Sequence, residues 1–233
     1  MSPDISKIYE IWSTPLLDEP ATFTESVTSR AYRALERMIV TLELAPASIT
    51  TEGALIELVG LGRTPVREAI QRLAWEGLVE VRPRSGIAIG AIHPADWLRV
   101  IDARRGVEII LARAAARYVT RGAAEQLYDA GMAMQKAVVA GNVIAFLEAD
   151  KALDETMATA SDNPFAARLA APLQTHSRRF WFRFQADSGL APAAEHHVSL
   201  IRAIVDGDMQ GAGNEADRLM GLLRANAETV ARR

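Results

Sequence analysis

The chain has 233 residues, 49% hydrophobic and 24% charged, with a mean hydropathy of +0.04, which suits one large or two ordinary folded domains and excludes collagen-like and disordered chains. Its lack of cysteine excludes disulfides, thiolate metal sites and cysteine nucleophiles, and four histidines leave little material for a histidine-rich catalytic site. The net charge of −3 predicts no overall attraction to nucleic acid, so a DNA contact requires a local basic surface.

The first part of the chain predicts an arm followed by a helix. Residues 1–23 contain three prolines and no sustained period, so we expect an arm with one short helix around Ile5–Trp12 and assign it no function. From Val27 onwards apolar residues recur at helical spacing. This first helix must end before Pro46, because the residue that precedes a proline disfavours helical geometry.

Two further helices are expected before residue 78. The second is short, and the hydroxyl of Thr50 or Thr51 is placed to cap its N-terminus. The third is expected to have Thr64 as its cap and Pro65 at its first helical position, where the missing N–H costs nothing, and to end at Gly77.

A β-hairpin with a basic tip is predicted after the third helix. Apolar residues alternate on both sides of the segment Arg82-Pro83-Arg84-Ser85-Gly86. They are Val79, Val81, Ile87 and Ile89. The order of three helices and a hairpin, with two short helices joined through a glycine, is the layout of a winged helix-turn-helix.

The open face of the third helix carries side chains suited to reading DNA. Val66, Ala69, Ile70, Leu73 and Ala74 make one apolar stripe. The residues left at the helix entry or on the open face are Arg63, Thr64, Arg67, Glu68, Gln71 and Arg72. Residues 24–91 contain eight arginines and eight acidic residues, but residues 63–84 contain five arginines and three glutamates, so a positive surplus of two lies in the proposed reading elements.

The chemistry of these side chains fits the major groove. The guanidinium of arginine can donate two hydrogen bonds to O6 and N7 of guanine, and Thr64 can hold a phosphate at the positive end of the helix. At the wing, Arg84 can follow a phosphate or the minor groove, and Gly86 allows close approach of the backbone. Arginines beside glutamates are also typical of an ordinary solvated helix face, so the pattern alone leaves both interpretations open.

The rest of the chain predicts a bundle of about six helices. His93-Pro94 marks a boundary, and glycines and asparagines divide residues 94–233 into helical segments. We expect helices near 94–119, 122–140, 143–161, 164–185, 192–206 and 209–231. The sequence therefore predicts a mainly α protein, with an arm at 1–23, a winged helix-turn-helix domain at 24–91 and an all-α bundle at 92–233.

Two carboxylates in the bundle require partners if they are buried. Asp150 and Asp154 are one turn apart on a helix with an apolar face. Burying them is costly unless Arg104, Arg178, His197 or a metal ion compensates. Three alternatives stay open: a solvated face for the aspartates, a capping or core role for His197, and an Arg104 that pairs with Glu108 one turn later.

Both halves of the chain resemble one family of bacterial transcription regulators. The segment from Tyr32 through Ile89, with Gly62-Arg63-Thr64-Pro65-Val66-Arg67-Glu68 and the wing Arg82 to Gly86, resembles the DNA-binding domain of the GntR family. The helical part resembles that family's FadR-type ligand domain, the FCD domain. The motifs that carry this second resemblance are Arg104-x3-Glu108, Asp150 within Phe-Leu-Glu-Ala-Asp, Asn163-Pro164-Phe165, Glu195-His196-His197 and Ala203-Ile204-x3-Asp208.

The resemblance implies roles for individual residues. It implies that Arg63 and Arg67 contact bases, that Thr64 contacts the DNA backbone, and that Gly86 lies at the minor groove. It also implies a small-molecule effector, often an organic acid in this family, and Arg104 would suit a carboxylate as a bidentate donor. We expect the effector to contact Arg104, Asp150, Asn163, Arg178 and His197.

Departures from the family pattern concern the operator and the metal. Gly62 and Gly53 stand where the family usually has serine and arginine, so two backbone contacts are expected to be lost. Metal-binding members have an aspartate, a histidine four residues later and two further histidines. The corresponding residues here are Asp150, Asp154, His197 and Leu219, so half of the set is replaced. Three ligands could still hold Zn, Ni or Mn, although the leucine argues for weaker affinity or a metal-free pocket.

The sequence thus predicts a homodimeric DNA-binding regulator that binds a near-palindromic double-stranded operator and responds to a small carboxylate effector. The alternative is a metal-dependent helical enzyme acting on an organic acid, with Asp150, Asp154 and His197 as ligands; no catalytic base or nucleophile is identifiable beyond these residues. No run of about 18 uncharged apolar residues and no signal-peptide pattern is present, so we expect a cytoplasmic protein with no membrane partner.

Overall fold

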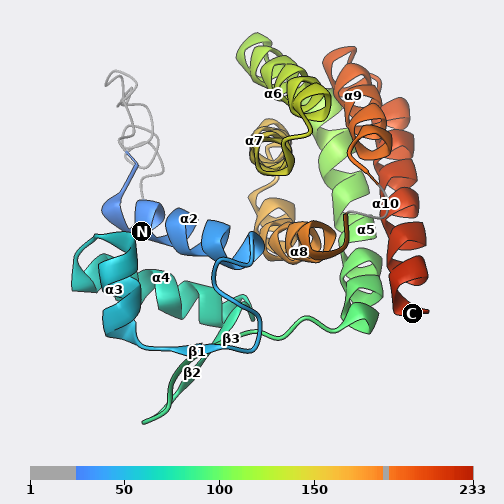
Figure 1. The fold of residues 1–233 in the computed structure, drawn as a ribbon. Coiled ribbons are helices and arrows are strands. Elements are labelled where there is room, and N and C mark those ends of the chain that lie inside the picture. Colours follow the sequence, from blue (N-terminus) through green and yellow to red (C-terminus); the bar gives the residue numbers. More distant parts are fainter. Residues whose placement is uncertain (1–24, 186–188, 233) are drawn as a thin grey trace, which may run out of the picture.

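The computed structural model describes residues 25–185 and 189–232. These residues form nine helices and three strands arranged in two groups (Figure 1). The predicted arm at 1–23, with its short helix, lies outside the described residues. Within the two described segments, no helix is both long enough and apolar enough to cross a membrane.

The N-terminal group has its own hydrophobic core. Its elements are α2 (Val27–Val40), β1 (Ile49–Thr50), α3 (Glu52–Val59), α4 (Arg63–Trp75), β2 (Val79–Arg82) and β3 (Gly86–Ile89). The Oγ of Ser26 caps α2, and the Oγ1 of Thr51 caps α3 as predicted. The core lies between the three helices and the sheet, and its largest fully buried side chains include Leu35, Ile39, Leu73, Leu78 and Ile89.

The start of α4 differs from the prediction. Its N-cap is Gly62 and its first residue is Arg63, with no side-chain capping bond, so Thr64 lies inside the first turn. The predicted cap at Thr64 is therefore wrong. Because α4 starts earlier, the N–H groups at its start, which include that of Arg63, are free of intrahelical partners and add to the positive end of the helix.

The predicted hairpin is confirmed, and a third strand joins it. The strand order is β1-β3-β2, all antiparallel, with Val79 opposite Ile89 and Thr50 opposite Ile87. Gly86 has a φ of +100°, and a Cβ there would lie 2.4 Å from the carbonyl oxygen of Thr50. The fold itself therefore requires glycine at this position, independently of any DNA contact.

The C-terminal group is the predicted bundle of six helices. They are α5 (Pro94–Tyr118), α6 (Arg121–Ala140), α7 (Val143–Ala160), α8 (Pro164–Phe184), α9 (Ala191–Val205) and α10 (Met209–Ala231). Each predicted boundary lies within one residue of the observed one. Side chains of Thr120, Asn142, Asn163 and Asp208 cap four of the helices, which explains why the sequence marked these boundaries well.

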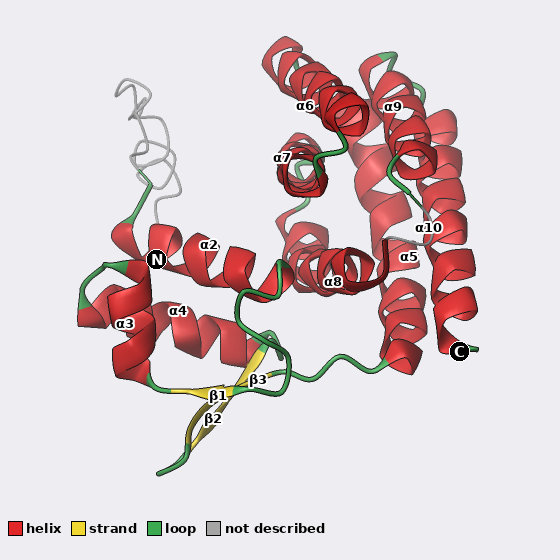
Figure 2. Ribbon diagram, viewed as in Figure 1, coloured by secondary structure: helices red, strands yellow, loops and turns green. Residues whose placement is uncertain are grey.

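Helix α8 lies where the two groups meet. It packs against α5 and α7 of the bundle on one side and against α2 on the other. The loop from β3 to α5, green in Figure 2, is the covalent connection between the groups. A side chain on α8 can therefore touch both the bundle interior and the N-terminal group.

Candidate nucleic-acid interface and buried polar cluster

The predicted reading face of α4 is open to solvent. Val66, Ala69, Ile70 and Leu73 are buried in the core of the N-terminal group. On the other face, the side chains of Arg63 and Arg67 are 80% and 66% exposed, and Thr64 and Gln71 are exposed as well. The first turns of α4 thus present two guanidinium groups, a hydroxyl and an amide without obstruction by the described part of this chain.

Glu52 at the start of α3 lies close to both reading arginines. One carboxylate oxygen of Glu52 is 3.5 Å from Nε of Arg67, and the other is 4.0 Å from Nε of Arg63. These distances permit only weak, solvent-screened ion pairs. A DNA phosphate would compete with this carboxylate for the two arginines.

Replacing Glu52 with glutamine is expected to raise affinity for DNA of any sequence by about threefold at low salt, since an exposed ion pair is worth under about 1 kcal/mol. Fluorescence anisotropy with a random duplex measures this. Glu57→Gln removes the same charge from the same helix and serves as control, because Glu57 makes no ion pair among the described residues. An equal gain from both variants would show that net charge alone is responsible.

Other arginines of the domain differ in their surroundings. The guanidinium of Arg72 stacks over the ring of Tyr32 at 3.7 Å and bonds Glu76, so it serves the end of α4 rather than its reading face. At the wing, Arg82 pairs with Glu80. Arg84 is exposed at the tip with a φ of +66°. Of the wing arginines, Arg84 is therefore the better placed to follow a phosphate.

Four of the five predicted effector residues meet in the interior of the bundle. Arg104 donates from Nε and Nη2 to Glu108 at 2.8 and 3.1 Å. Arg178 donates from Nη1 to Asp154 at 2.7 Å. Nε2 of His197 lies 2.9 Å from Asp150. All six side chains are buried, so the aspartates are not on a solvated face, and Arg104 does pair with Glu108.

The charges of this polar cluster depend on one another. Burial disfavours ionisation of Asp150, but the hydrogen bond and charge of His197 outweigh it, so the pKa of Asp150 is lowered. For His197 burial acts in the opposite sense to the bond with Asp150, and the net effect raises its pKa. Burial, with help from the neighbouring carboxylates, raises the pKa of Asp154 to about 7. The bond between Nε2 of His197 and Asp150 therefore favours the charged form of both groups.

His176, which is partly buried, and His197, which is buried, are expected to titrate on opposite sides of the ordinary histidine pKa of about 6.5. Burial lowers the pKa of His176, whereas Asp150 raises that of His197. The charge on His197 therefore stabilises the fold fully below the unfolded pKa, and this contribution is lost as pH rises through the folded pKa. Histidine NMR titrations, assigned with His176→Asn and His197→Gln, measure both; the reverse order would contradict the structure.

The cavity beside this cluster is almost filled. About 20 Å³ remains between Arg104, Asp150, Arg178, Trp181 and His197, which is room for about one water molecule. As it stands, this space is too small for an organic molecule. The prediction for Asn163 is not supported, because its side chain accepts from the N–H of Ala166 and caps α8. A capping asparagine and a pocket asparagine have the same local sequence pattern.

The predicted metal ligands do not fit a metal ion. No group of three or more histidine, aspartate and glutamate side chains within residues 25–185 and 189–232 is arranged to hold one. Asp154 faces the guanidinium groups of Arg178 and Arg104, and Leu219 is buried where the family pattern has a histidine. Two arginines thus supply positive charge beside the aspartates.

The cluster extends into the N-terminal group through Glu36 of α2. Glu36 is 4% exposed and accepts from Oγ1 of Thr175 at 2.6 Å and from Nζ of Lys151. Nη2 of Arg178 lies 3.9 Å from the same carboxylate. Arg178 therefore stands between the aspartates of the bundle and the first helix of the N-terminal group.

The predictions from the sequence missed Glu36 and two further contacts from α8. Nε2 of His176 lies 2.8 Å from the carbonyl oxygen of Glu76 at the end of α4, and Nη2 of Arg179 donates to that of Gly90 at 2.6 Å. A signal existed for Glu36, which lies one turn from buried Tyr32 and Val40 on the apolar side of its helix. Its partners, more than a hundred residues away, could not be identified.

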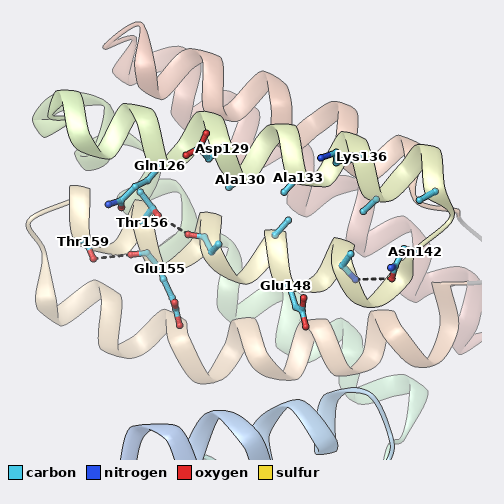
Figure 3. A pocket seen from close by; sticks show the side chains of 15 residues that line it. Gln126, Asp129, Ala130, Ala133, Lys136, Asn142, Glu148, Glu155, Thr156 and Thr159 are labelled. Atoms are coloured by element: carbon cyan, nitrogen blue, oxygen red, sulfur yellow. Dashed lines mark hydrogen bonds between the residues drawn. The ribbon is translucent and has the colours of Figure 1, made fainter. Parts of the chain in front are cut away.

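A groove of about 840 Å³ lies on another part of the bundle, between α6 and α7 (Figure 3). Its floor is formed mainly by alanines, and Asp129, Lys136, Glu148 and Glu155 stand around it. None of the residues that line the Arg104–His197 cluster lines this groove. The predicted effector residues therefore do not belong to it.

Comparison with protein families agrees with both groups. Residues 27–89 match the bacterial regulatory proteins of the gntR family, and residues 99–221 match the FCD domain. The chain therefore belongs to the GntR family of bacterial regulatory proteins and carries an FCD domain in its C-terminal half. This membership points to a transcription regulator and away from the enzyme alternative.

Individual relatives cover parts of the chain. It is 44% identical over 81 residues to an HTH-type transcriptional regulator in an unstable DNA locus of Streptomyces ambofaciens, covering 34% of this chain and 33% of the relative. It is 34% identical over 104 residues to the HTH-type transcriptional repressor RspR of Escherichia coli K12, covering 45% and 46%. The matched parts are thus at most about half the length of these relatives.

A solved structure supports the fold over a longer stretch. Escherichia coli McbR/YncC superposes with a TM-score of 0.76 at 18% sequence identity, covering 88% of this chain and 99% of that one. At this identity the match concerns the fold, which includes both groups of helices.

Proposed function

We propose that this chain is a DNA-binding transcription regulator whose α4 reads the major groove of an operator. The observation that carries the proposal is the exposure of Arg63, Thr64, Arg67 and Gln71 on one face of a helix whose other face is buried. Arginine can discriminate guanine through O6 and N7, and glutamine can discriminate adenine. The N-terminus of α4 and the wing residue Arg84 supply phosphate contacts.

The active form is proposed to be a homodimer on a near-palindromic operator. A helix that presents four side chains contacts few base pairs, and two linked modules multiply the discrimination. A two-fold axis would place two copies of α4 in major grooves about one helical turn apart.

The effector is proposed to be a small carboxylate that exchanges into the polar cluster. Arg104 and Arg178 are fork-shaped donors already bound to carboxylates of this chain, so a ligand carboxylate can replace one of these partners. Asp150 and His197 would contact the remainder of the ligand. We propose that the site works without a metal, since the guanidinium groups provide the positive charge.

The route from effector to DNA is proposed to pass through Arg178. Its guanidinium contacts Asp154 and lies near Glu36, so a shift toward a ligand weakens its attraction for the first helix of the DNA-binding group. Helix α2 packs against α4, so a change at Glu36 alters the position of the reading face. The effector thereby changes operator affinity.

Selection of bound duplexes from random DNA tests the regulator proposal. We expect enrichment of inverted repeats with half-sites about one helical turn apart. The recovered site is then titrated in the presence of small carboxylates and of their neutral amides, and a carboxylate alone should change the affinity. Failure to enrich any sequence over several rounds would contradict sequence-specific reading.

A further inference from the structure

A second cavity lies between the C-terminal end of α4 and the bundle. It has a volume of about 450 Å³, within the range of small-molecule sites. Its walls come from the Trp75–Gly77 segment, from the loop after β3, and from α5 and α8. None of the residues that line the polar cluster lines this cavity, so the two are separate.

Arg179 is the unusual residue of this cavity. It is 3% exposed and donates from Nη2 to the carbonyl oxygen of Gly90 at 2.6 Å. Among the described residues, Nε of Arg179 has no hydrogen-bond partner, and no carboxylate pairs with its guanidinium. Burial without such a partner lowers the pKa of Arg179 to about 10, which leaves it charged at neutral pH.

A buried guanidinium without a counter-ion is costly, and a bound anion would remove that cost. A buried guanidinium is usually neutralised by carboxylates of the same protein. Arg178, the neighbour of Arg179 on α8, is an example, since it lies near three carboxylates. Arg179 instead lines the second cavity, with its Nε buried and unpaired among the described residues. The guanidinium of Arg179 therefore has no counter-ion among the described residues, and a bound anion could supply one.

The remaining walls define the body of the ligand. Five of these wall residues are apolar, and one of them, Trp75, is 89% exposed. They are Trp75, Val100, Pro172, Leu173 and Phe180. Asp96 and Glu76 also line the cavity. The Asp96 carboxylate is bound to Arg99, the Glu76 carboxylate is bound to Arg72 and Tyr32, and the two charges disfavour a second anionic group on the ligand. Nε2 of His176 donates to the carbonyl oxygen of Glu76, so it is already partnered.

We infer that this cavity is a second ligand site, which takes a small monocarboxylate with a flat apolar body and binds its carboxylate through Arg179. The ligand would touch the last residues of α4 and the bundle at once. The bound ligand would therefore fix the position of α4 relative to α8. The inference does not depend on the proposed effector in the polar cluster.

The tryptophans provide a direct test. The chain has four, of which Trp75 lines the second cavity and Trp181 lines the polar cluster. Full-length protein labelled with 5-fluorotryptophan is titrated with 2-naphthoate and followed by fluorine NMR, with Trp75→Phe and Trp181→Phe used for assignment. We expect a saturable shift of the Trp75 signal, and about tenfold weaker binding of neutral 2-naphthamide.

Variants locate the carboxylate. Arg179→Gln should weaken 2-naphthoate about tenfold or more and leave 2-naphthamide unchanged, whereas Arg179→Lys should retain part of the preference. A shift of the Trp181 fluorine signal without a shift of the Trp75 signal would overturn the inference. Equal affinity of the wild-type protein for 2-naphthoate and 2-naphthamide would also overturn it. These wild-type readouts need no variant, so a variant that fails to fold does not weaken the test.

Discussion

Replacing Arg178 with methionine is expected to lower the free energy of unfolding by about 3–5 kcal/mol. Arg178 is 7% exposed and donates to Asp154 at 2.7 Å and to Asp150 at 3.4 Å. Methionine keeps much of the apolar volume but leaves two buried aspartates and Glu36 with less compensation. Urea denaturation, with the midpoint and slope compared between proteins, measures the loss.

The loss should depend on pH in a definite direction. The pKa of Asp154 is already raised to about 7, and removing Arg178 raises it further. A protonated Asp154 needs no cation, so the difference between wild type and variant should be smaller at pH 6 than at pH 8. Arg105→Met is the matched control, because Arg105 bonds Asp217 at 2.6 and 2.8 Å on the surface.

An exposed pair of this kind is worth about 0–1 kcal/mol. Equal losses for Arg178→Met and Arg105→Met would show that the buried cluster has no special weight. A loss of unfolding free energy in Arg178→Met that becomes larger toward acid pH would contradict the raised pKa of Asp154.

Replacing Arg67 with alanine is expected to reduce discrimination between the operator and unrelated DNA by about 1–3 kcal/mol, the value of a bidentate arginine–guanine contact. The side chain of Arg67 is 66% exposed and lies near Glu52 only at 3.5 Å, so its removal should leave the fold stable. Competition of labelled operator with random duplex, at fixed salt, measures the ratio of the two affinities.

The control for Arg67→Ala removes the same charge far from the reading face. Arg121 on α6 is 94% exposed and pairs with Glu125 within its own helix. Arg121→Ala should change both affinities little and leave their ratio unchanged. If Arg67→Ala lowers both affinities equally, Arg67 contacts phosphate rather than a base.

Local signals in the sequence were sufficient for most of the fold. Glycines in left-handed geometry, such as Gly60 and Gly141, and capping side chains such as Asn142 and Asp208 mark helix ends through contacts within a few residues. Strand β1 was missed because two residues, Ile49–Thr50, form a strand only by pairing with β3, which lies far along the chain.

The sequence predicted the exposed reading face of α4. It predicted the buried polar cluster of the bundle only in part. Amphipathic spacing separates the exposed Arg63 and Arg67 from the buried residues of α4, which the structure reproduces. Pairing in the interior depends on tertiary packing, so the sequence could not choose between Glu108 and a ligand for Arg104. The same limit applies to Arg179, whose burial follows from the meeting of the two groups.

Methylation interference on the selected operator tests the central proposal most directly. Methylation of guanine N7 blocks the acceptor that an arginine uses in the major groove. We expect interference at one or more guanines in each half-site, and loss of interference at one of them with Arg67→Ala. Binding that tolerates methylation of every guanine in both half-sites would contradict major-groove reading of guanine by α4.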